Sequence, residues 1–325
     1  MMVGESRIMH ELRTRVLRVA RTSFTVLVEG ESGAGKELVA REIHARSPRH
    51  RGPFVAVNCA ALVETLVEAE LFGIEERIAT GVRGRRGKFE QADQGTLFMD
   101  EVADLSPTAQ AKLLRVLQDM TVERIGGSTS NKIDARVVVA TNRSLHDMVS
   151  AGRFRADLYY RLSGVEIVVP PLRTRREDIP LLVRHFLSMY SPTVTMTVAP
   201  NASEALVAYD WPGNVRQLGR VLERAVALAS RPEIALADLP DHLRGAGRRV
   251  LGAEPQSDDS LRAWSSRYVH LVLARCGGNK RRACEILDIS YHTLQAHLSF
   301  NQVLSQRPSE SPDRHMLSVR CDAVV

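Results

Sequence analysis

The sequence predicts an α/β fold in which helices cover both faces of a parallel sheet. Short apolar runs alternate along the chain with segments whose apolar residues recur at helical spacing. The runs lie at residues 25–28, 53–58, 95–101, 136–142 and 165–169. Parallel strands that are buried on both faces have such continuous apolar runs. A glycine-rich segment between the first run and the helix after it is the second observation, because phosphate-binding loops occupy this position.

Composition and charge narrow the class of protein. The chain has 325 residues, of which 44% are hydrophobic and 25% charged, and this length predicts two or three domains. The formal net charge of +6 permits a polyanionic partner without requiring one. The four cysteines lack a C-x-x-C pair, which argues against a disulfide framework and a zinc site and suits a reducing cytosol. No apolar run approaches the roughly 18–20 residues of a membrane span, so a cytoplasmic protein without a membrane partner is expected.

The N-terminal segment is predicted to be a helix over residues 5–21. Ile8, Leu12, Val16 and either Leu17 or Val19 fall on one face at helical spacing. Because the segment is amphipathic and charged, it does not resemble a signal peptide.

The strongest motif is G-x-x-x-x-G-K at residues 30–36, between a strand and a helix. Its glycines allow backbone N–H groups to surround a phosphate at the N-terminus of the helix, and Lys36 can neutralise the β and γ phosphate oxygens. The next residue is Glu37, so the hydroxyl that usually binds Mg²⁺ is missing. The predicted nucleotide-binding residues here are Gly30, Glu31, Ser32, Gly33, Ala34, Gly35, Lys36 and Glu37.

Residues 62–71 are predicted to form a helix, and a segment without apolar periodicity follows at 73–88. Its basic side chains are Arg77, Arg83, Arg85, Arg86 and Lys88. We interpret this segment as a basic loop or a loose hairpin.

Two acidic residues end the apolar run at 95–101. Asp100 is expected to hold Mg²⁺, directly or through water, and Glu101 to polarise the water that attacks the γ-phosphate. The alternative is a buried strand that ends in two solvated acids, which the preceding phosphate loop disfavours. A helix is expected at 107–119.

Polar residues end the strand at 136–142, and two arginines occur in the segment after it. Thr141 and Asn142 end a strand at the edge where parallel strands converge on a ligand, so they are candidate γ-phosphate sensors, with a turn-forming Asn as the alternative. Arg155 and Arg161 lie six residues apart around Asp157. Arginines from a neighbouring subunit can stabilise charge on a transferring phosphate, whereas periodicity alone favours surface salt bridges here.

The chain divides into segments of different character. Residues 1–172 are predicted to be the nucleotide-binding part, 173–244 an all-helical part, 245–259 a linker and 260–300 a small helical unit. Residues 301–325 lack periodicity and a clear core, and they are expected to be a disordered tail.

The small C-terminal unit has the pattern of a helix-turn-helix. A first helix at 261–276 places Trp264, Tyr268, Leu271 and Val272 on one face, and a short second helix spans 280–287. After a tight turn, Ser290 caps a third helix at 291–298 that would enter the major groove. Ala283, Ile289 and Leu294 are expected to pack inside. Tyr291, His292, Thr293, Gln295 and His297 are the candidates for facing DNA.

Together these motifs resemble the AAA+ ATPase domain of bacterial enhancer-binding proteins, the activators of sigma-54 RNA polymerase. The matching segments, in order over residues 3 to about 243, are GESGAGKE, FVAVNCAAL, AELFG, GKFEQADQGTLFMDE, LLRVLQD, ATNRSL, FRADLYYRL, PPLRTRREDIPLL and WPGNVRQL. Within this family a glutamate such as Glu37 is usual after the lysine. The resemblance implies an AAA+ parallel sheet, a helical lid and ATP hydrolysis with Mg²⁺.

The resemblance also implies residue roles. Asn58 would restrain Glu101 until the γ-phosphate is sensed, Thr141 and Asn142 would be sensor I, and Arg216 would be sensor II from the lid. Arg155 and Arg161 would reach the site of the next protomer, so the active species would be a ring, expected to be a hexamer.

One segment departs from the family pattern. The loop that contacts sigma-54 carries GAFTGA in the family, and here it reads Arg77, Ile78, Ala79, Thr80, Gly81 and Val82. Ala79 replaces the aromatic residue, and aromatic anchors tend to dominate binding at interfaces. Either the loop acts on a different partner, or the protein regulates without remodelling; a drifted loop that still works weakly is a third possibility.

The C-terminal unit resembles the Fis-type domain that commonly ends enhancer-binding proteins. Lys280, Arg281 and Arg282 would contact DNA phosphates, and a dimer would bind pseudo-palindromic, enhancer-like upstream sites. The leading hypothesis is thus an ATP-hydrolysing transcriptional regulator that binds DNA and a sigma factor, sigma-54 or another. The competing hypotheses are a DNA-binding regulator in which ATP only controls oligomeric state, and a nucleic-acid remodelling ATPase. No receiver, PAS or GAF-like segment precedes residue 3, so regulation is expected from a partner protein or from a longer chain.

Overall fold

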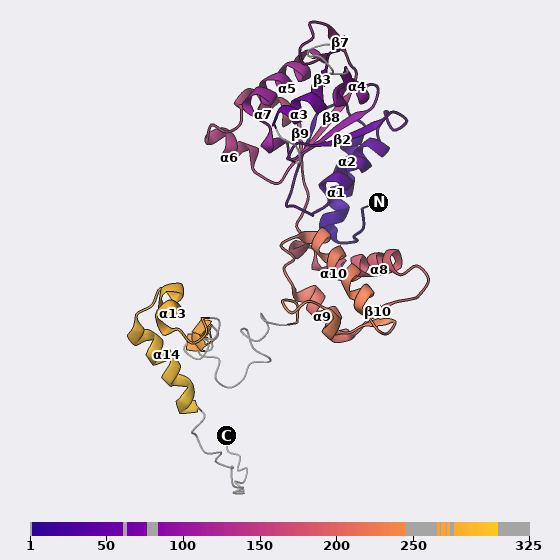
Figure 1. The fold of residues 1–325 in the computed structure, drawn as a ribbon. Coiled ribbons are helices and arrows are strands. Elements are labelled where there is room, and N and C mark those ends of the chain that lie inside the picture. The colour runs from indigo at the N-terminus through magenta and orange to yellow at the C-terminus, as the bar shows by residue number, and fades with distance from the viewer. Residues whose placement is uncertain are drawn as a thin grey trace, which may run out of the picture. The chain divides into compact units, whose positions relative to one another are not determined.

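The computed structural model describes residues 2–60, 64–76, 84–244 and 276–304, together with 265–266, 268–270 and 272–273. The chain forms two compact units, Met1–Arg244 and Gly245–Val325, each of which is described by itself. The first unit contains a central sheet with its helices and a separate group of helices that we call the lid, residues 172–244 (Figure 1).

The central sheet has five parallel strands in the order β2-β5-β8-β1-β9, which confirms the predicted fold class. These are β1 (Val26–Glu29), β2 (Phe54–Asn58), β5 (Thr96–Asp100), β8 (Arg136–Thr141) and β9 (Val165–Val168). All six residues of β8 are buried because it lies between β5 and β1. The prediction of a buried strand at 53–58 was wrong for most of its residues. Only Val57 is buried in β2, because this strand lies at an edge of the sheet.

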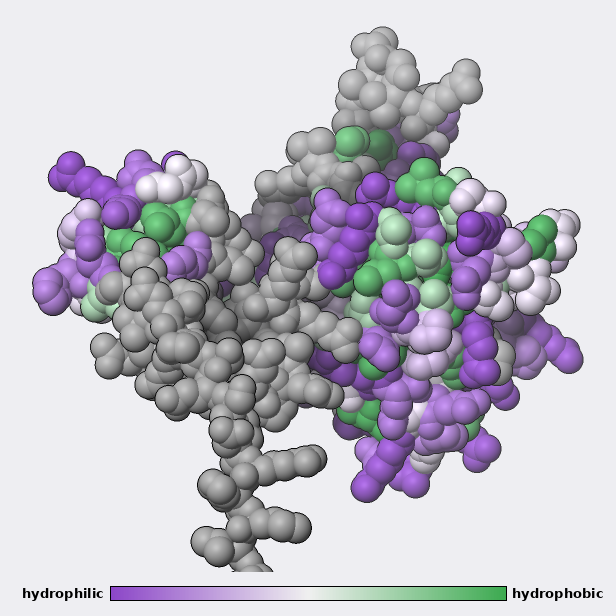
Figure 2. Space-filling model, turned by 90° about the horizontal axis from the view of Figure 1, so that it is seen from below, coloured by the Kyte–Doolittle hydropathy of each residue, from purple (hydrophilic) through white to green (hydrophobic). Residues whose placement is uncertain are grey.

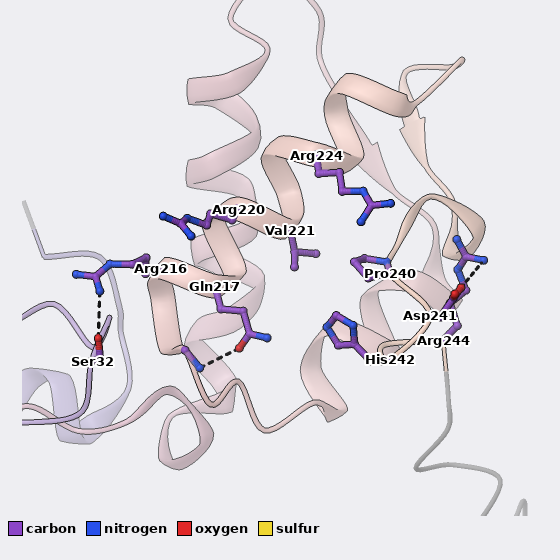
Figure 3. A pocket seen from close by; sticks show the side chains of 11 residues that line it. Ser32, Arg216, Gln217, Arg220, Val221, Arg224, Pro240, Asp241, His242 and Arg244 are labelled. Atoms are coloured by element: carbon purple, nitrogen blue, oxygen red, sulfur yellow. Dashed lines mark hydrogen bonds and ion pairs between the residues drawn. The ribbon is translucent and has the colours of Figure 1, made fainter. Parts of the chain in front are cut away.

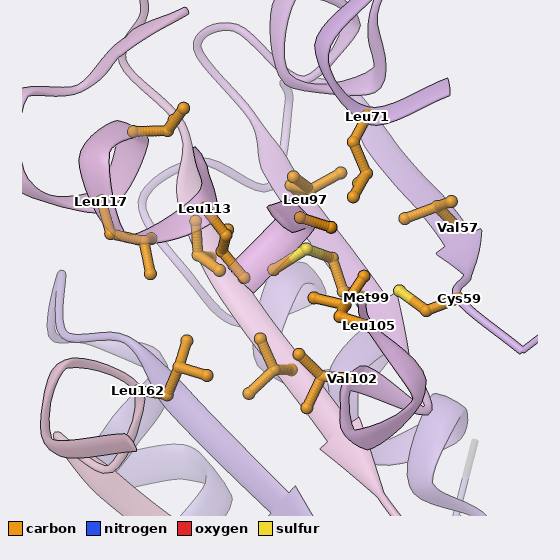
Figure 4. Packing of buried hydrophobic residues seen from close by; sticks show 14 of the residues in the cluster. Val57, Cys59, Leu71, Leu97, Met99, Val102, Leu105, Leu113, Leu117 and Leu162 are labelled. Carbon is orange, nitrogen blue, oxygen red and sulfur yellow. The ribbon is translucent and has the colours of Figure 1, made fainter. Parts of the chain in front are cut away.

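Helices cover both faces of the sheet, as alternate strand residues point to opposite sides. On one face, α1 (Arg7–Ala20) and α2 (Lys36–Ala45) pack on Val26, Val28 and Phe98. On the other, Leu27, Leu97 and Met99 contribute to a larger cluster (Figure 4). The helices that complete this cluster are α3 (Glu64–Phe72), α4 (Lys88–Gln91), α5 (Pro107–Asp119), α6 (Leu145–Ser150) and α7 (Ala156–Leu162).

The buried face of α1 confirms the prediction for Leu12, Val16 and Val19, and differs from it at Ile8. Its buried residues are Met9, Leu12, Val16, Val19 and Ala20. Ile8, which was expected on this face, is 38% exposed, and of the two alternatives Val19 is buried whereas Leu17 is 45% exposed. Met9 also has helical spacing to Leu12 and Val16, and packing against the sheet selects it over Ile8 as the start of the stripe.

Short antiparallel pairs extend from the sheet. β3 (Gly73–Ile74) pairs with β4 (Arg85–Arg86), and β6 (Thr121–Glu123) pairs with β7 (Ser130–Lys132). The β3–β4 pair agrees with the hairpin interpretation of 73–88. Residues 77–83, which include the whole predicted partner loop, lie outside the described residues.

The lid packs around the fully buried Trp211. Its helices are α8 (Ile179–Tyr190), α9 (Pro200–Ala208) and α10 (Asn214–Leu228), with 3-10 turns at Leu172–Thr174, Arg176–Asp178 and Leu236–Asp238. The lid is not all-helical as predicted. Two-residue strands β10 (Thr197–Val198) and β11 (Glu233–Ile234) form a parallel pair that is too short to leave a periodic signal.

In the second unit, α13 (Lys280–Leu287) and α14 (Tyr291–Leu304) are joined by a short turn with Asp288 at φ 50°. Val269, Val272, Ala283 and Leu294 form its core. Tyr268, which was predicted on the buried face, is 40% exposed, and Val269 is buried instead. Trp264 and Leu271 lie outside the described residues. α14 continues past the predicted end of its helix and into the predicted disordered tail; residues 305–325 lie outside the described residues.

Apolar side chains are concentrated in the interior clusters. On the face drawn in Figure 2, hydrophilic residues cover most of the described surface and hydrophobic areas are small. Within the described part of the chain, no helix has the length and apolar character needed to cross a membrane.

Candidate nucleotide site

The glycine-rich loop connects the end of β1 to the start of α2. Gly33 and Gly35 adopt φ values of +75° and +111°, which side chains rarely tolerate. A Cβ at Gly33 would also collide with the carbonyl oxygen of Gly213 in the lid. The loop therefore requires glycine both for its own conformation and for the close approach of the lid.

Lys36 lies at the first position of α2 and is 7% exposed. Its Nζ donates a hydrogen bond of 2.9 Å to the carbonyl oxygen of Gly30 and lies 3.5 Å from Oε1 of Glu101. The ammonium group thus sits between the phosphate loop and the acidic end of β5, where it can exchange these contacts for phosphate oxygens.

Asp100 and Glu101 end β5 beside this lysine. Burial and the charge of Glu101 raise the pKa of Asp100, and Lys36 opposes this shift. Glu101 has a φ of 54°, and its Oε2 accepts a 3.1 Å hydrogen bond from the backbone N–H of Asn142. A non-glycine residue in this left-handed region is strained, and such strain is concentrated at functional sites.

The structure places Asn58 and the strand-end residues of β8 around the same acidic pair. Asn58 pairs with Asp100 in the β2–β5 register, and its Oδ1 accepts from the N–H of Ala60 at 2.9 Å. Thr141 is fully buried, and its hydroxyl contacts the backbone N–H and carbonyl of Arg143 at 3.0 and 3.2 Å. Asn142 is exposed beside Glu101, so of the two candidate sensors it is the one with access to a ligand.

The two candidate finger arginines lie on α7 and its N-cap. Arg155 is exposed and forms a two-pronged ion pair with Asp157, at 3.0 and 2.7 Å. Arg161 donates two hydrogen bonds to the carbonyl oxygen of Leu117, at 3.1 and 2.6 Å. Neither arginine is among the described residues that line the nucleotide cavity of its own chain.

The lid contacts the phosphate loop through several polar side chains. Arg216 Nη1 donates to Ser32 Oγ at 3.1 Å, and the Arg216 N–H donates to the Gly33 carbonyl at 3.3 Å. Arg216 is therefore positioned at the phosphate loop, as the resemblance implies for a sensor in the lid.

Sequence reasoning missed a second lid contact, which is more buried. Asn214, with φ 50° and no exposed area, donates from Nδ2 to Glu31 Oε2 and to the Ser32 carbonyl, both at 3.1 Å. Arg173 pairs with the same carboxylate at 2.6 Å. The hydrogen bond from Arg173, which is the largest cause, and the one from Asn214 lower the pKa of Glu31 to about 2. Both residues lie in quoted segments, PPLRTRREDIPLL and WPGNVRQL, so their motifs were visible although their roles were not.

A cavity of about 440 Å³ lies between the loop, the acidic pair and the lid. Among its lining residues are Gly35, Lys36, Asp100, Glu101, Arg216 and Arg220. Arg220 was not a sequence candidate. The cavity collects basic side chains from two elements around the two carboxylates, which suits a phosphate chain with a cation.

A smaller apolar cavity of about 130 Å³ adjoins the loop at Gly35. Met2, Val3, Val39 and Phe186 are among its lining residues, which suits a planar ring. The N-terminal segment that provides Met2 and Val3 is held by Asp178. This carboxylate accepts from the N–H groups of Glu5 and Ser6 and from the Ser6 hydroxyl, at 2.6–2.8 Å.

The predicted DNA-contacting residues lie on the second unit. Lys280, Arg281 and Arg282 are exposed on α13, whose N-cap Asn279 accepts from the N–H of Arg282 at 3.1 Å. Ser290 Oγ accepts from the N–H of Thr293 at 3.1 Å, as predicted for a cap. Tyr291, His292 and Gln295 are exposed on α14, and Thr293 and His297 are partly buried.

The parallel sheet, the glycine-rich loop with its lysine, the acidic pair on β5 and the lid arginine together define an ATPase of the AAA+ class. The model of the sigma-54 interaction domain family matches residues 2–168, and that of the AAA+ ATPase lid domain matches residues 173–253. The chain belongs to the sigma-54 interaction domain family, and its first unit is an ATP-binding AAA+ ATPase.

Individual relatives support this assignment. The transcriptional regulatory protein ZraR of Klebsiella oxytoca is 48% identical over 305 residues, covering 92% of this chain and 68% of that protein. The regulatory protein AtoC of Escherichia coli strain K12 is 44% identical, covering 86% of this chain and 63% of that protein. The crystal structure of NtrX from Brucella abortus in complex with ATP has a TM-score of 0.73 and 38% identity, covering 92% of this chain and 69% of NtrX.

Proposed function

We propose that this protein is an ATP-hydrolysing, DNA-binding transcriptional regulator of the sigma-54 activator type. The observation that carries the proposal is the placement of Lys36, Glu101 and Arg216 around one cavity, in a chain of the sigma-54 interaction domain family. The relatives named as transcriptional regulators support the regulatory part of the proposal.

Each residue of the cavity has a chemical role in this proposal. Lys36 would leave the Gly30 carbonyl for the β and γ phosphates, and Glu101 would orient the attacking water. Asp100 is a half-buried carboxylate beside a second acid, which fits Mg²⁺, and the ion when bound would neutralise phosphate charge. Among the described residues no group of three or more His, Cys, Asp and Glu side chains could hold a metal.

The site is completed by a neighbouring protomer in a ring, expected to be a hexamer. Arg155 is the exposed N-cap residue of α7, and within the described part of the chain its guanidinium group pairs with Asp157 at the surface, a contact that can exchange for a phosphate. Arg161 is bound to the Leu117 carbonyl, so Arg155 is the better candidate for the finger that acts in trans.

Two further surfaces would connect hydrolysis to transcription. Residues Arg77 to Val82 would contact the sigma factor, with an anchor weakened by Ala79, and this loop lies outside the described residues. In the second unit, α13 and α14 would act as a helix-turn-helix. Lys280, Arg281 and Arg282 would contact DNA phosphates, and exposed residues of α14 would contact base edges.

The alternative is a DNA-binding regulator in which ATP only sets the oligomeric state. The substitution at Ala79 favours it, because the loop lacks the aromatic group that would engage sigma-54. The two functions differ in whether hydrolysis itself is required for regulation.

The proposal is tested with Glu101→Gln in the full chain. We expect this variant to retain ATP while hydrolysis falls by a factor of about 100 or more, because the water is no longer oriented. The control is Glu42→Gln on the same helix as Lys36, where the lost carboxylate is partly exposed and pairs with Arg46.

Steady-state hydrolysis, nucleotide retention and transcription from a cognate promoter are measured together. Loss of both hydrolysis and transcription activation in Glu101→Gln supports the proposal. Full activation by the hydrolysis-deficient protein would contradict it and support the alternative.

A further inference from the structure

A second large hollow lies on the lid, away from the acidic pair. Its volume is about 750 Å³, within the range of small-molecule sites. The lining residues are Ser32, Gly213, Arg216, Gln217, Arg220, Val221, Arg224, Pro240, Asp241, His242 and Arg244. Figure 3 shows that one wall is α10 and the other is the segment 240–244. We call this hollow the lid pocket.

One wall of the lid pocket is a row of arginines. Arg216, Arg220 and Arg224 recur every four residues, so they lie along one face of α10. At about 1.5 Å per residue the row spans about 12 Å. Arg216 contacts Ser32, whereas Arg220 and Arg224 have no hydrogen-bond or ion-pair partner among the described residues. Like charges at this spacing destabilise a helix unless an anion lies between them.

The opposite wall holds an ion pair and an imidazole ring. Arg244 Nη1 pairs with Asp241 at 3.1 Å, and the Asp241 side chain is 95% exposed, so the acidic residue of the lining is already paired and directed to solvent. The His242 ring packs at a tilt of 55° against the ring of Tyr209, with centroids 5.4 Å apart. In Figure 3, Arg224 extends across the hollow toward Pro240, and His242 lies opposite Gln217 and Val221.

We propose that the lid pocket binds a small molecule that carries two or more phosphate groups. Guanidinium groups match phosphate oxygens in pairs, and a row of three suits a chain of phosphates better than a single anion. Val221, Pro240 and the His242 ring provide apolar contact for the remainder of a nucleotide. The lid pocket shares Ser32, Arg216 and Arg220 with the catalytic cavity but excludes Lys36, Asp100 and Glu101. Arg224, Pro240, His242 and Arg244 line the lid pocket and not the catalytic cavity, so it is a second site that adjoins the first.

The test is calorimetric titration of the nucleotide-free full chain in magnesium-free buffer, where one binding event is assigned to the catalytic cavity. ADP is left out because it carries two phosphates and would fill the lid pocket as well. The probes are inorganic tripolyphosphate and, in a second arm, GDP. We expect one additional binding event per chain. Arg224→Gln should weaken that event at least tenfold, because Arg224 is exposed, lies in the lid pocket and does not line the catalytic cavity.

The matched control is Arg231→Gln, which removes the same charge from an exposed lid position outside the lid pocket. Its affinity should stay within twofold of the parent. Tighter binding of GDP than of tripolyphosphate assigns the ligand to nucleotides, and the reverse assigns it to other polyphosphates. Absence of an additional event for both probes overturns the proposal. Equal losses in Arg224→Gln and Arg231→Gln also overturn it, because they would show diffuse attraction and no defined site.

Discussion

At the scale of one residue, Asp100 is a group in the nucleotide site whose ionisation lowers the stability of the folded protein. Burial and the neighbouring Glu101 raise its pKa, so the folded protein favours the protonated carboxyl more than the unfolded chain does. The stabilising contribution of this group is present below its ordinary pKa and is lost as the pH rises through its raised folded pKa. Ionisation of this carboxyl, as the pH rises through its raised pKa, therefore destabilises the fold of the nucleotide-free protein.

We predict that Asp100→Asn raises the thermal unfolding midpoint of the nucleotide-free protein at pH 7, while Mg²⁺-dependent hydrolysis falls at least tenfold. The gain should shrink toward acidic pH, where the parent carboxyl is protonated as well. Differential scanning fluorimetry across pH measures the midpoint, and Glu123→Gln at an exposed position provides the control. An equal or lower midpoint in Asp100→Asn at pH 7 would contradict this account.

Single residues also show where sequence reasoning reaches its limit. Lys36, Asp100, Glu101 and Arg216 were predicted from motifs, and the structure brings them around one cavity. The contacts of Thr141 could not be predicted. Its hydroxyl hydrogen-bonds to the backbone of Arg143 because the chain turns back after the end of β8, and the sequence does not reveal this turn. Motifs identify which residue types occur, whereas access to a ligand depends on the local turn.

At the scale of elements, the contact between lid and phosphate loop depends on Asn214. Its Oδ1 accepts the N–H of Leu172 at 2.8 Å, and its Nδ2 donates to Glu31 and to the Ser32 carbonyl. Since the side chain is fully buried, its loss leaves the Leu172 N–H without this acceptor.

We predict that Asn214→Ala lowers the free energy of unfolding by about 1–3 kcal/mol, the usual cost of an unsatisfied buried polar group. Urea denaturation measures the change. Asn201→Ala on the exposed side of α9 is the control and should stay within about 0.5 kcal/mol of the parent. The same small change in both variants would show that Asn214 does not hold the lid to the loop.

Elements differ in how well they could be predicted. The inner strands were found as apolar runs because they are buried on both faces. The exposure of β2 was missed because an edge position follows from strand order, which the local sequence does not contain. The buried stripe of α1 was predicted correctly at Leu12, Val16 and the alternative Val19, and it was wrong only at Ile8. Ile8 and Met9 can both begin a helical stripe, and packing on the sheet selects Met9. The two-residue pair β10–β11 is too short for any periodicity.

At the scale of the whole molecule, the catalytic site is proposed to be shared between protomers. Arg155 lies outside the cavity of its own chain, so an Arg155→Ala protomer lacks the finger but keeps an intact phosphate loop. A Lys36→Ala protomer lacks the lysine of the phosphate loop but keeps the arginine finger.

We predict that each variant alone loses hydrolysis at least tenfold and that an equimolar mixture regains a measurable fraction of parental activity. Recovery is expected because some mixed interfaces combine an intact loop with an intact arginine. Steady-state phosphate release from the mixture measures this, with Arg184→Ala, at an exposed lid position, as a control expected to remain active without mixing. A mixture no more active than the sum of its parts would exclude an arginine that acts in trans.

The coupling of hydrolysis to transcription is tested most directly by capture of purified sigma-54. The full chain is immobilised with ADP–aluminium fluoride, which mimics the transition state, and is compared with nucleotide-free protein and with Ala79→Phe. We predict that capture requires the transition-state mimic and that Ala79→Phe retains at least tenfold more sigma-54 than the parent, because it restores the aromatic anchor. Capture that is independent of nucleotide, or that is as strong in the parent as in Ala79→Phe, would contradict this account.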